Sequence, residues 1–381
     1  MVPGSVRRVS QTMRRAAGTF AATRYPAGYH GDYQGDAGFF EGWYVKLVSA
    51  DRSARLALIP GIFKASDRGA RGEEAQDEAF VQVLDGITGE SWYETFPASQ
   101  FRADPRVFDV TLWGPGGEGH GTGDVPLAGA AVSTPVQRFD ERGLSVDLAG
   151  PQLSGSVRYT SPLDPWPVTM SEPGVMGRYA WVPVMECYHG LVSFGHGLEG
   201  TLTLGDQELD FTGGRGYIEK DWGRAFPQGY VWMQTHHFDT PGVSLSASIA
   251  TIPWGRSRFQ GFIVGLRIAN SAQDTLHKFA TYTGARTTVV EIDDASVRWE
   301  MKAKSGDRLR LWAERRRGGL LHAPVRTQMH RRVEETLDAR VHVELVGADG
   351  TELFAGTGEA AGLEVHGDLA ELVALSGRPS R

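Results

Sequence analysis

The sequence predicts an all-β protein made of two β-barrel domains, and three observations lead to this fold class. Apolar and polar residues alternate with a period of two along many short segments, as they do in strands with one buried face. Turn-forming pairs such as Asp85-Gly86 and Asp349-Gly350 separate many of these segments. The chain has 381 residues, which exceeds one comfortable core, so two domains are expected.

The alternation begins at residues 43–47, where Trp43, Val45 and Leu47 share one face of an expected strand and Tyr44 takes the other. Closing sheets of so many strands into barrels would remove their exposed edges. The same pattern returns in both halves of the chain, at residues 108–112, 144–148, 153–159, 198–204, 243–249, 309–311 and 341–345.

Prolines are dense between residues 161 and 183, and proline is excluded from central strands, so this stretch is predicted to connect two β domains. Helical periodicity is confined to a short stretch near Leu369 and Val373. The expected domains are a disordered basic arm over residues 1–28, an N-terminal barrel over 29–170, a C-terminal barrel over 171–370 and a tail over 371–381.

The composition is that of a globular protein without a nucleic-acid partner. Hydrophobic residues make up 41% and charged residues 22%, and the net charge of −7 supplies no basic face for phosphates. The single cysteine, Cys187, excludes an internal disulfide. No run of 18 apolar residues exists, so we expect a cytoplasmic location without a membrane-spanning helix.

The first 31 residues contain five arginines and no acidic residue before Asp32. They lack the apolar core of a secretory signal. A disordered basic arm is the simpler interpretation, and contact with a membrane surface or a transit-like segment is the alternative. Peripheral membrane contact is therefore kept open, and the sequence gives no indication of the oligomeric state.

Three segments place acidic residues among aromatic ones: 39–44 (FFEGWY), 185–190 (MECYHG) and 216–223 (GYIEKDWG). A carboxylate held between large rings loses its hydration, which raises its pKa. A general acid that works near neutral pH requires such a pKa. We therefore predict that the three segments lie close together around a shared site.

The candidate site residues come from these segments and from the strand that follows the third one. That strand carries Tyr230 and further polar and aromatic residues on one face. The complete candidate set is Glu41, Trp43, Tyr44, Glu186, His189, Glu219, Lys220, Asp221, Trp222, Trp232, Gln234 and His236.

A purely structural interpretation of these residues is also open. Glu219, Lys220 and Asp221 could form an ion-pair network that fixes a tight turn, and aromatic residues in β-barrels commonly belong to the core. No metal site is expected, because His236 and His237 point to opposite faces of a strand. The sequence has no dinucleotide-binding fingerprint and no Gly-x-Ser-x-Gly elbow, so no cofactor is expected.

Residues 39–44 resemble the N-terminal motif of the tocopherol cyclase family. Residues 219–227, with the Trp232-x-Gln234 strand behind them, resemble its central motif, and residues 362–365 (GLEV) also fit. The resemblance runs from about Tyr29 to about Asp368. It implies two lipocalin-like antiparallel β-barrels packed side by side with a short C-terminal helix, a fold shared with related carotenoid hydratases.

The resemblance further implies cyclisation of a prenylated phenol to a chromanol, an isomerisation that starts by protonating an alkene and needs no metal or redox cofactor. It makes Glu219 the proton donor and Asp221 its partner or alternate. Glu41 or His189 would orient the phenol or accept its proton. The substrate-binding residues would be Trp43, Tyr44, Glu186, Lys220, Trp222, Trp232, Gln234 and His236.

One bias of the composition weakens the case for tocopherol itself as the product. Six of the 39 basic residues are lysine and Asn270 is the sole asparagine, a bias typical of GC-rich bacterial genomes. Another terpenoid or polyketide substrate, or hydration of an isoprenoid double bond, is therefore an alternative. So is a non-catalytic carrier of a hydrophobic ligand, which would gain nothing from acidic residues gathered in one cavity.

Overall fold

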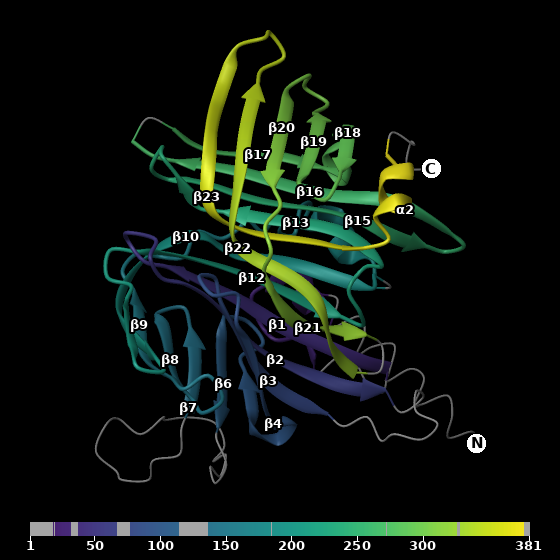
Figure 1. Cartoon of the computed structure of the whole chain (residues 1–381). Helices are drawn as coiled ribbons and strands as arrows, with labels where there is room; N and C mark the ends of the chain where they lie inside the picture. Colours follow the sequence, from purple (N-terminus) through teal and green to yellow (C-terminus); the bar gives the residue numbers. More distant parts are fainter. Residues whose placement is uncertain are drawn as a thin grey trace, which may run out of the picture.

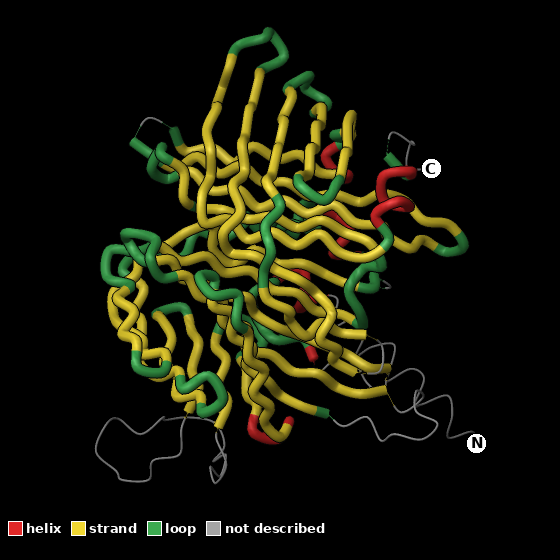
Figure 2. The backbone as a smooth tube through the Cα atoms, in the orientation of Figure 1, coloured by secondary structure: helices red, strands yellow, loops and turns green. Residues whose placement is uncertain are grey.

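The computed structural model describes residues 18, 20–31, 37–66, 77–113, 136–183, 185–271, 273–325 and 328–376. Strands make up most of these residues, and helix is confined to short pieces (Figure 2). The strands form two antiparallel sheets, and a short helix, α2 (Leu369–Ala374), follows the last strand. The all-β class and the short C-terminal helix are therefore confirmed.

The first sheet has twelve strands in the order β4-β3-β2-β1-β12-β10-β9-β8-β7-β6-β5, with β11 paired to β10 (Figure 1). Its defining feature is that the first strand, β1, pairs with the last, β12. The strands are β1 (Ala37–Val48), β2 (Arg55–Ser66), β3 (Glu78–Asp85), β4 (Ser91–Pro97), β5 (Phe101–Ala103), β6 (Asp109–Trp113), β7 (Val136–Asp140), β8 (Gly143–Leu148), β9 (Leu153–Tyr159), β10 (Cys187–Leu204), β11 (Gln207–Asp210) and β12 (Arg215–Gly223).

The second sheet has eleven strands in the order β17-β16-β15-β13-β23-β22-β20-β19-β18, with β14 on β23 and β21 on β22. Here too the first strand, β13, pairs with the last, β23. The strands are β13 (Gly229–Thr235), β14 (His237–Phe238), β15 (Val243–Trp254), β16 (Ser257–Ala269), β17 (Asp274–Ala280), β18 (Arg286–Ile292), β19 (Ser296–Lys302), β20 (Arg308–Glu314), β21 (Gly319–Val325), β22 (Gln328–Val346) and β23 (Glu352–Gly367).

Both sheets curl, because the two edge strands of each are consecutive in the chain. The edges β4 and β5 of the first sheet are joined by a single 3-10 turn, η2 (Ala98–Gln100), and η4 (Thr281–Thr283) lies between β17 and β18 of the second. Among the described strands no pairing links β4 to β5 or β17 to β18. The closure of each sheet into a barrel therefore stays a prediction.

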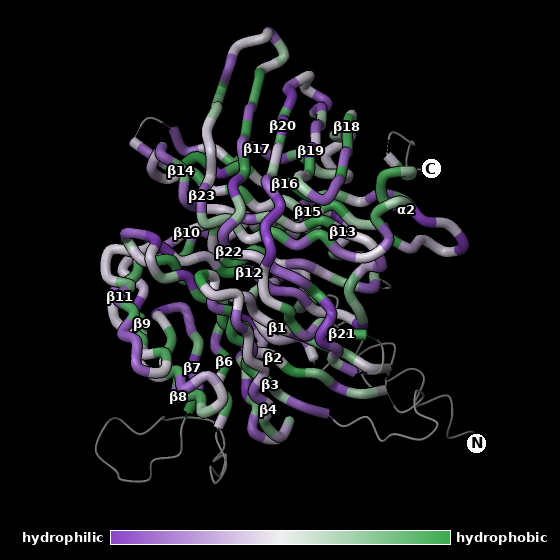
Figure 3. Tube along the Cα trace, viewed as in Figure 1, coloured by the Kyte–Doolittle hydropathy of each residue, from purple (hydrophilic) through white to green (hydrophobic). Residues whose placement is uncertain are grey.

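Among the described residues, four hydrophobic clusters follow from the alternation of side chains, which Figure 3 shows along many strands. Trp43, Val45 and Leu47 belong to the core of the first sheet, and a second core fills the second sheet. Tyr44 and Trp232 belong to a third cluster between the sheets. Each large apolar side chain that becomes fully buried contributes about 1.5–3 kcal/mol to stability.

The long strand β22 joins the two sheets. Irregular pairing with β23 between Thr336 and Val341 bends it, as β-bulges do. Its first half pairs with β21 beside the first sheet, and its second half pairs with β20 (Figure 1). The Gln82 side chain on β3 bonds both backbone groups of His322 on β21, at 2.7 and 2.9 Å.

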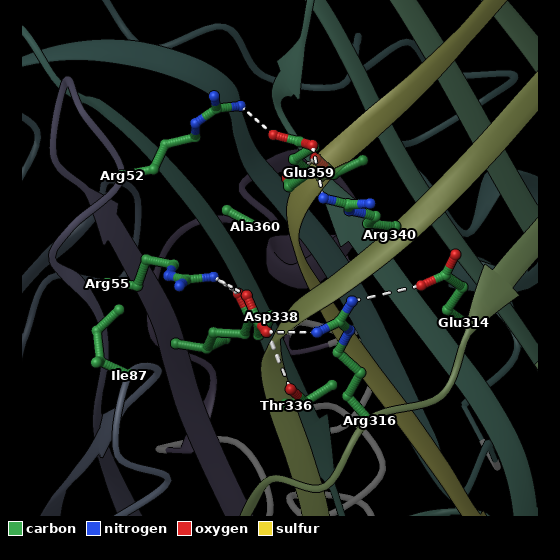
Figure 4. A network of polar contacts seen from close by, with 12 residues as sticks. Arg52, Arg55, Ile87, Glu314, Arg316, Thr336, Asp338, Arg340, Glu359 and Ala360 are labelled. Atoms are coloured by element: carbon green, nitrogen blue, oxygen red, sulfur yellow. Dashed lines mark hydrogen bonds and ion pairs between the residues drawn. The ribbon is translucent and has the colours of Figure 1, made fainter. Parts of the chain in front are cut away.

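A network of ion pairs also crosses between the sheets (Figure 4). Arg55 on β2 pairs with Asp338 on β22, and Arg52 in the preceding turn pairs with Glu359 on β23. Arg316 contacts Asp338 at 3.1 Å. Exposed pairs of this kind contribute about 0.2–1 kcal/mol each, so they support the docking of the sheets but do not drive it.

The chain leaves the first sheet after Gly223 and enters the second at Gly229, so β10 to β12 complete the first sheet. Residues 161–183 contain no strand beyond an isolated bridge, together with the 3-10 helix η3 (Gly177–Trp181). This stretch is thus an irregular excursion that returns to the first sheet, because β10 pairs with β9 and β12. The predicted domain limits themselves stay a prediction.

Part of the predicted disordered arm differs from the expectation. Residues 20–24 are helical, and the loop after them is hydrogen-bonded to the first sheet. The indole Nε1 of Trp43 donates to the Ala27 carbonyl at 2.9 Å, and the Lys220 ammonium donates to the Gly28 carbonyl. These buried donors hold the loop in place. Residues 1–17 lie outside the described part of the chain.

Candidate active site

A pocket lies between the two sheets, where the seam β1–β12 faces the seam β13–β23. Most of its wall is apolar, and its polar groups are concentrated in a few side chains. This composition suits a hydrophobic ligand with a polar end. The aromatic and methionine residues of the wall include Phe40, Phe80, Met176, Met185, Tyr188, Phe226, Phe259, Phe262, Tyr282 and Met329.

The three segments that the sequence singled out are neighbouring strands. Residues 39–44 lie on β1 and residues 216–223 on β12, its partner, while β10 carries His189 on the far side of β12. Tyr44 stands directly opposite Glu219, and His189 directly opposite Asp221. Directly opposite residues share a face of the sheet, so these four side chains all point into the pocket. The predicted proximity of the segments is confirmed.

His189 lies between the two carboxyl groups of β12. Its Nδ1 is 2.9 Å from Oδ1 of Asp221, and its Nε2 is 3.5 Å from Oε2 of Glu219. Burial alone would lower the pKa of His189, but the two carboxylates more than offset this and raise its pKa to about 9. The imidazolium form is therefore the resting form of this ring at neutral pH.

Glu219 is the most strongly enclosed of the three groups. Its Oε2 accepts hydrogen bonds from the Tyr217 hydroxyl and, at 3.1 Å, from the indole Nε1 of Trp232 on the second sheet. Burial raises the pKa of Glu219 to about 7, against the opposing effect of His189. A carboxyl with this pKa holds a proton for part of the time at neutral pH and can release it to a bound ligand.

The ligand atoms of His189, Glu219 and Asp221 lie within 4.8 Å of one another, so this group could in principle hold a divalent cation. The two ring nitrogens of His189, however, face different carboxylates. This is the geometry of an ion-pair relay. A single metal ion could use one of these nitrogens and would break the contact made by the other.

A second group of acids, which the sequence analysis missed, lies on the other side of the pocket. Glu364 on β23 lines the pocket, and Glu335 stands opposite it on β22. The Tyr230 hydroxyl donates to Glu364 at 2.6 Å, and the Tyr44 hydroxyl donates to Oε1 of Glu335. Burial raises the pKa of Glu335 to about 7 and the pKa of Glu364 well above its ordinary value.

Glu41 and Lys220, two of the candidate residues, lie on the opposite face of the β1–β12 pair. Both are fully buried, and Nζ of Lys220 lies 2.5 Å from Oε1 of Glu41. The His30 backbone N–H donates to both carboxylate oxygens of Glu41, at 2.9 and 3.0 Å. The ammonium of Lys220 also lies over the rings of Trp43 and Trp222, at 5.0 and 4.6 Å from the centroids.

This second face is structural. Trp43 and Trp222 belong to the core of the first sheet, and neither these indoles nor Glu41 and Lys220 line the pocket. The reason is the two-residue period of the strand, which sends Glu219 and Asp221 to one side and Lys220 and Trp222 to the other. The expected roles of Glu41 in orienting a phenol and of these residues in substrate binding therefore lack geometric support.

Gln234 shares a face of β13 with Trp232, as predicted, whereas His236 follows the end of that strand; neither residue lines the pocket. The Gln234 amide accepts from Lys46 Nζ at 3.0 Å and contacts the His236 ring at 2.8 Å. They form part of the buried contact between the sheets. Glu186 does not line the pocket either; its backbone carbonyl accepts from the Arg224 N–H at 2.8 Å.

Cys187 is a wall residue and not an activated nucleophile. Its thiol lies 3.9 Å from Oδ1 of Asp221, and burial together with that carboxylate raises the pKa of the thiol well above its ordinary value. A thiolate, the reactive form, is therefore suppressed here.

Fold and site together define an all-β protein with a mostly apolar pocket between two curled sheets, each of which contributes acidic groups to its wall. The chain belongs to the tocopherol cyclase-like family, whose sequence model matches residues 37–367. No curated protein sequence matches the chain. Among the described residues, no helix has the length and apolar character needed to cross a membrane.

Several solved structures are similar to the chain over most of their length, at low sequence identity. CghA, solved with Sch210972, is 13% identical with a TM-score of 0.47, over 86% of this chain and 88% of that one. Kievitone hydratase from Nectria haematococca is 11% identical with a TM-score of 0.44, over 92% and 93%. A putative AttH from Nitrosomonas europaea is 12% identical with a TM-score of 0.42, over 88% and 94%.

The structural role of the Glu41–Lys220 pair leads to a stability prediction. Lys220→Met leaves the Glu41 carboxylate buried without its cation, so unfolding in urea should show a loss of about 3–5 kcal/mol. The exposed Lys302→Met should change stability by less than about 0.5 kcal/mol. Adding Glu41→Gln to Lys220→Met should recover part of the lost stability. If Lys220→Met were as stable as Lys302→Met, the structural assignment of the Glu41–Lys220 pair would be contradicted.

Proposed function

We propose that this protein is an enzyme that cyclises a prenylated phenol or a related hydrophobic terpenoid by protonating an alkene, with Glu219 as the proton donor. One observation carries the proposal: Glu219, Asp221 and His189 converge in the wall of a mostly apolar pocket. Membership of the tocopherol cyclase-like family supports the same reaction class.

In the proposed reaction, Glu219 transfers its proton to the less substituted carbon of a trisubstituted alkene. The neighbouring carbon becomes a tertiary cation, which the faces of Tyr44 and Trp232 are placed to stabilise. The phenol oxygen of the same molecule then bonds to that carbon and loses its proton. The Glu219 carboxylate takes up this proton, directly or through His189 and Asp221, and the acid is restored.

The environment of Glu219 suits this sequence of charges. Its burial favours the neutral acid before the transfer, and the imidazolium of His189 favours the carboxylate after it. Asp221, which contacts the other nitrogen of His189, holds that ring in position and keeps it protonated. Glu219 thus acts on the substrate, and Asp221 acts through His189.

Two other functions use the same pocket. A hydratase of an isoprenoid double bond would share the protonation step and capture the cation with water; the side chain of Asp221, 29% exposed, marks where the relay meets solvent. A non-catalytic carrier would need only the apolar wall. It offers no reason for two carboxyl groups to share one histidine in the pocket, and it is therefore the weaker candidate.

Glu219→Gln keeps the size of the side chain but removes the acidic proton. With a prenylated hydroquinone as substrate, its turnover should fall by about 10²–10⁴, the usual contribution of a general acid, while ligand retention in the pocket survives. Asp221→Asn should lose less, because Asp221 acts through His189. The exposed Glu199→Gln is the matched control and should leave turnover unchanged.

Melting temperatures of the same preparations separate catalysis from structure. If Glu219 only stabilises the fold, Glu219→Gln will melt at a lower temperature and keep its turnover per folded molecule. That result, or normal turnover in a stable variant, would remove Glu219 from the mechanism.

The pKa of Glu219 also predicts a pH profile. Because the acid form is required and its pKa in the ligand-free protein is about 7, kcat/KM should fall toward tenfold per pH unit above about pH 7. The folded-state pKa exceeds the unfolded one, so the stability that this group contributes is complete at acidic pH and declines as the pH rises through 7. The stability of Glu219→Gln should lack that part of the decline with pH. An identical decline in the wild-type protein and in Glu219→Gln would contradict the raised pKa of Glu219.

A further inference from the structure

The most informative group that the proposed reaction leaves unused is the pair Glu335 and Glu364. The two residues are direct cross-strand partners on β22 and β23. Glu335 is fully buried, and Glu364 lines the ligand pocket. Two buried carboxylates this close repel each other and lose their hydration, so the pair cannot carry two negative charges unless nearby cations or donors compensate.

An unpartnered buried oxygen in the pair favours a proton there. The Tyr44 and Tyr230 hydroxyls satisfy one oxygen each, Oε1 of Glu335 and Oε2 of Glu364. Oε2 of Glu335 has no N–H or hydroxyl donor in the described part of the chain. Its cross-strand neighbour is the Glu364 carboxyl. A proton on either carboxyl would supply the donor that this oxygen lacks, because two carboxyl groups can hydrogen-bond only if one of them carries a proton.

The charges around the pair point the same way. The cation on this side is Lys46, which is itself fully buried and bound to the Ala360 carbonyl at 2.6 Å and to Gln234. Burial lowers the pKa of Lys46 to about 7. Glu219 and Asp221 add negative charge from the first sheet. Arg332 acts on the neighbouring Tyr230 hydroxyl. A single ammonium group with a lowered pKa cannot neutralise all of these carboxylates. Protonation of a carboxyl group must therefore remove part of the negative charge.

The position of Glu364 repeats that of Glu219. In the first sheet, Tyr44 on the first strand stands opposite Glu219 on the last strand. In the second sheet, Trp232 on the first strand stands opposite Glu364 on the last. The two aromatic rings meet edge to face, 5.3 Å apart, and both acids line the pocket. Each sheet therefore contributes one acid at its first–last seam.

We propose that Glu335 and Glu364 form a second acid centre, which holds one exchangeable proton at the pocket wall at neutral pH and presents it to an uncharged oxygen of the bound ligand. A neutral carboxylic acid can donate a hydrogen bond, whereas a carboxylate cannot. Such a centre favours a ketone, quinone or hydroxyl oxygen and repels carboxylate and phosphate groups. It does not depend on the proposed cyclisation, because the proton is present without substrate.

Infrared spectroscopy of the ligand-free protein tests the proton directly. At about pH 8, well above the ordinary pKa of a glutamic acid, the wild-type protein should show the carbonyl band of one protonated carboxyl. The band should shift in D₂O without unfolding, because Glu364 faces the pocket. Glu364→Gln should lose the band, and so should Glu335→Gln, since a glutamine amide can donate to the remaining carboxylate and leave it ionised.

Glu359→Gln is the matched control, because Glu359 lies on the same strand but pairs with arginines at the surface, and it should keep the band. Absence of the band from the wild-type protein would overturn the proposal even if both variants failed to fold. Persistence of the band in either folded variant would overturn it as well. Neither result bears on the turnover of Glu219→Gln, so the two proposals fail separately.

A second inference rests on a different feature, the exposed aromatic rim beside the pocket. Trp254 lies at the tip of the β15–β16 hairpin, which projects from the second sheet next to α2 (Figure 1), and is 41% exposed. Its ring packs against Tyr179 and Phe259, which both line the pocket. An apolar path thus leads from the surface at Trp254 to the pocket wall.

The rim continues from η3 to the N-terminal segment. Trp181 at the end of η3 contacts the ring of Phe20, and Phe20 and Met170 are 53% and 62% exposed. Three exposed arginines accompany these apolar side chains: Arg24, Arg178 and Arg256. These arginines stand out in a chain whose net charge is −7.

We infer that this rim docks on an anionic lipid bilayer, so that a hydrophobic ligand passes between the bilayer and the pocket. Aromatic side chains with neighbouring arginines are the composition of membrane-interface surfaces, in which rings enter the headgroup layer and cations bind anionic lipids. The three exposed arginines of the rim favour anionic over neutral lipid.

Sedimentation with phosphatidylserine-containing vesicles tests this surface. The wild-type protein should bind them better than pure phosphatidylcholine vesicles, and less at high salt. Trp254→Ala should reduce binding several-fold, and Arg256→Glu by about fivefold or more, from the contribution of one arginine near an anionic surface. Trp312→Ala is the control, because Trp312 is 40% exposed on β20, away from the pocket.

Equal binding of wild-type protein, Trp254→Ala and Arg256→Glu would overturn the inference. So would binding that appears only after deletion of residues 1–17, because the rim would then be covered by the chain's own N-terminal segment.

Discussion

The two-residue period of the strands at the first–last seam of each sheet determines the rest of the site. On β12 it divides a run of four charged and aromatic residues into two unlike pairs. Glu219 and Asp221 face the second sheet, and Lys220 and Trp222 face the core of the first. One pair can thus serve a ligand while the other holds residues 25–31 in place. Neither pair could move to the other face without inverting the whole strand.

Burial of acids is the second constraint, and it follows from the first. Four carboxyl groups, Glu219, Asp221, Glu335 and Glu364, gather between the sheets with two cations, His189 and Lys46. At a separation of 4 Å, two like charges repel by about 4 kcal/mol near a protein surface and by more in the interior. The group therefore retains protons at neutral pH. A pocket of this kind favours a developing carbocation and disfavours anionic ligands, which agrees with the proposed chemistry.

Part of this arrangement could be predicted from the sequence, because it is local. The alternation of apolar residues gave the all-β class, and acids among aromatics led to β1, β10 and β12, which proved to be neighbours. The same alternation, applied strictly to residues 219–222, would have placed Lys220 and Trp222 on the opposite face of the strand from Glu219. Gln234 lies on the predicted face of β13, but sequence alone does not say how far along a strand a pocket extends. Glu335 was beyond prediction, since its charged surroundings in the sequence resemble an exposed strand, and a bulge sets its register with Glu364.

The likeness of the two seams explains why the pocket lies where it does. Each sheet ends by pairing its last strand with its first, and at both places an aromatic residue stands opposite a glutamate: Tyr44 opposite Glu219 and Trp232 opposite Glu364. A β-carbon at Gly362 would lie 2.7 Å from the Trp232 ring, so glycine at this position lets the indole lie across β23 and reach Glu219. Because the seams face each other, each sheet supplies the aromatic partner that encloses the acid of the other. A single sheet would leave its glutamate in water with an ordinary pKa, and it is the docking of the two sheets that makes these carboxyl groups acids of use near neutral pH.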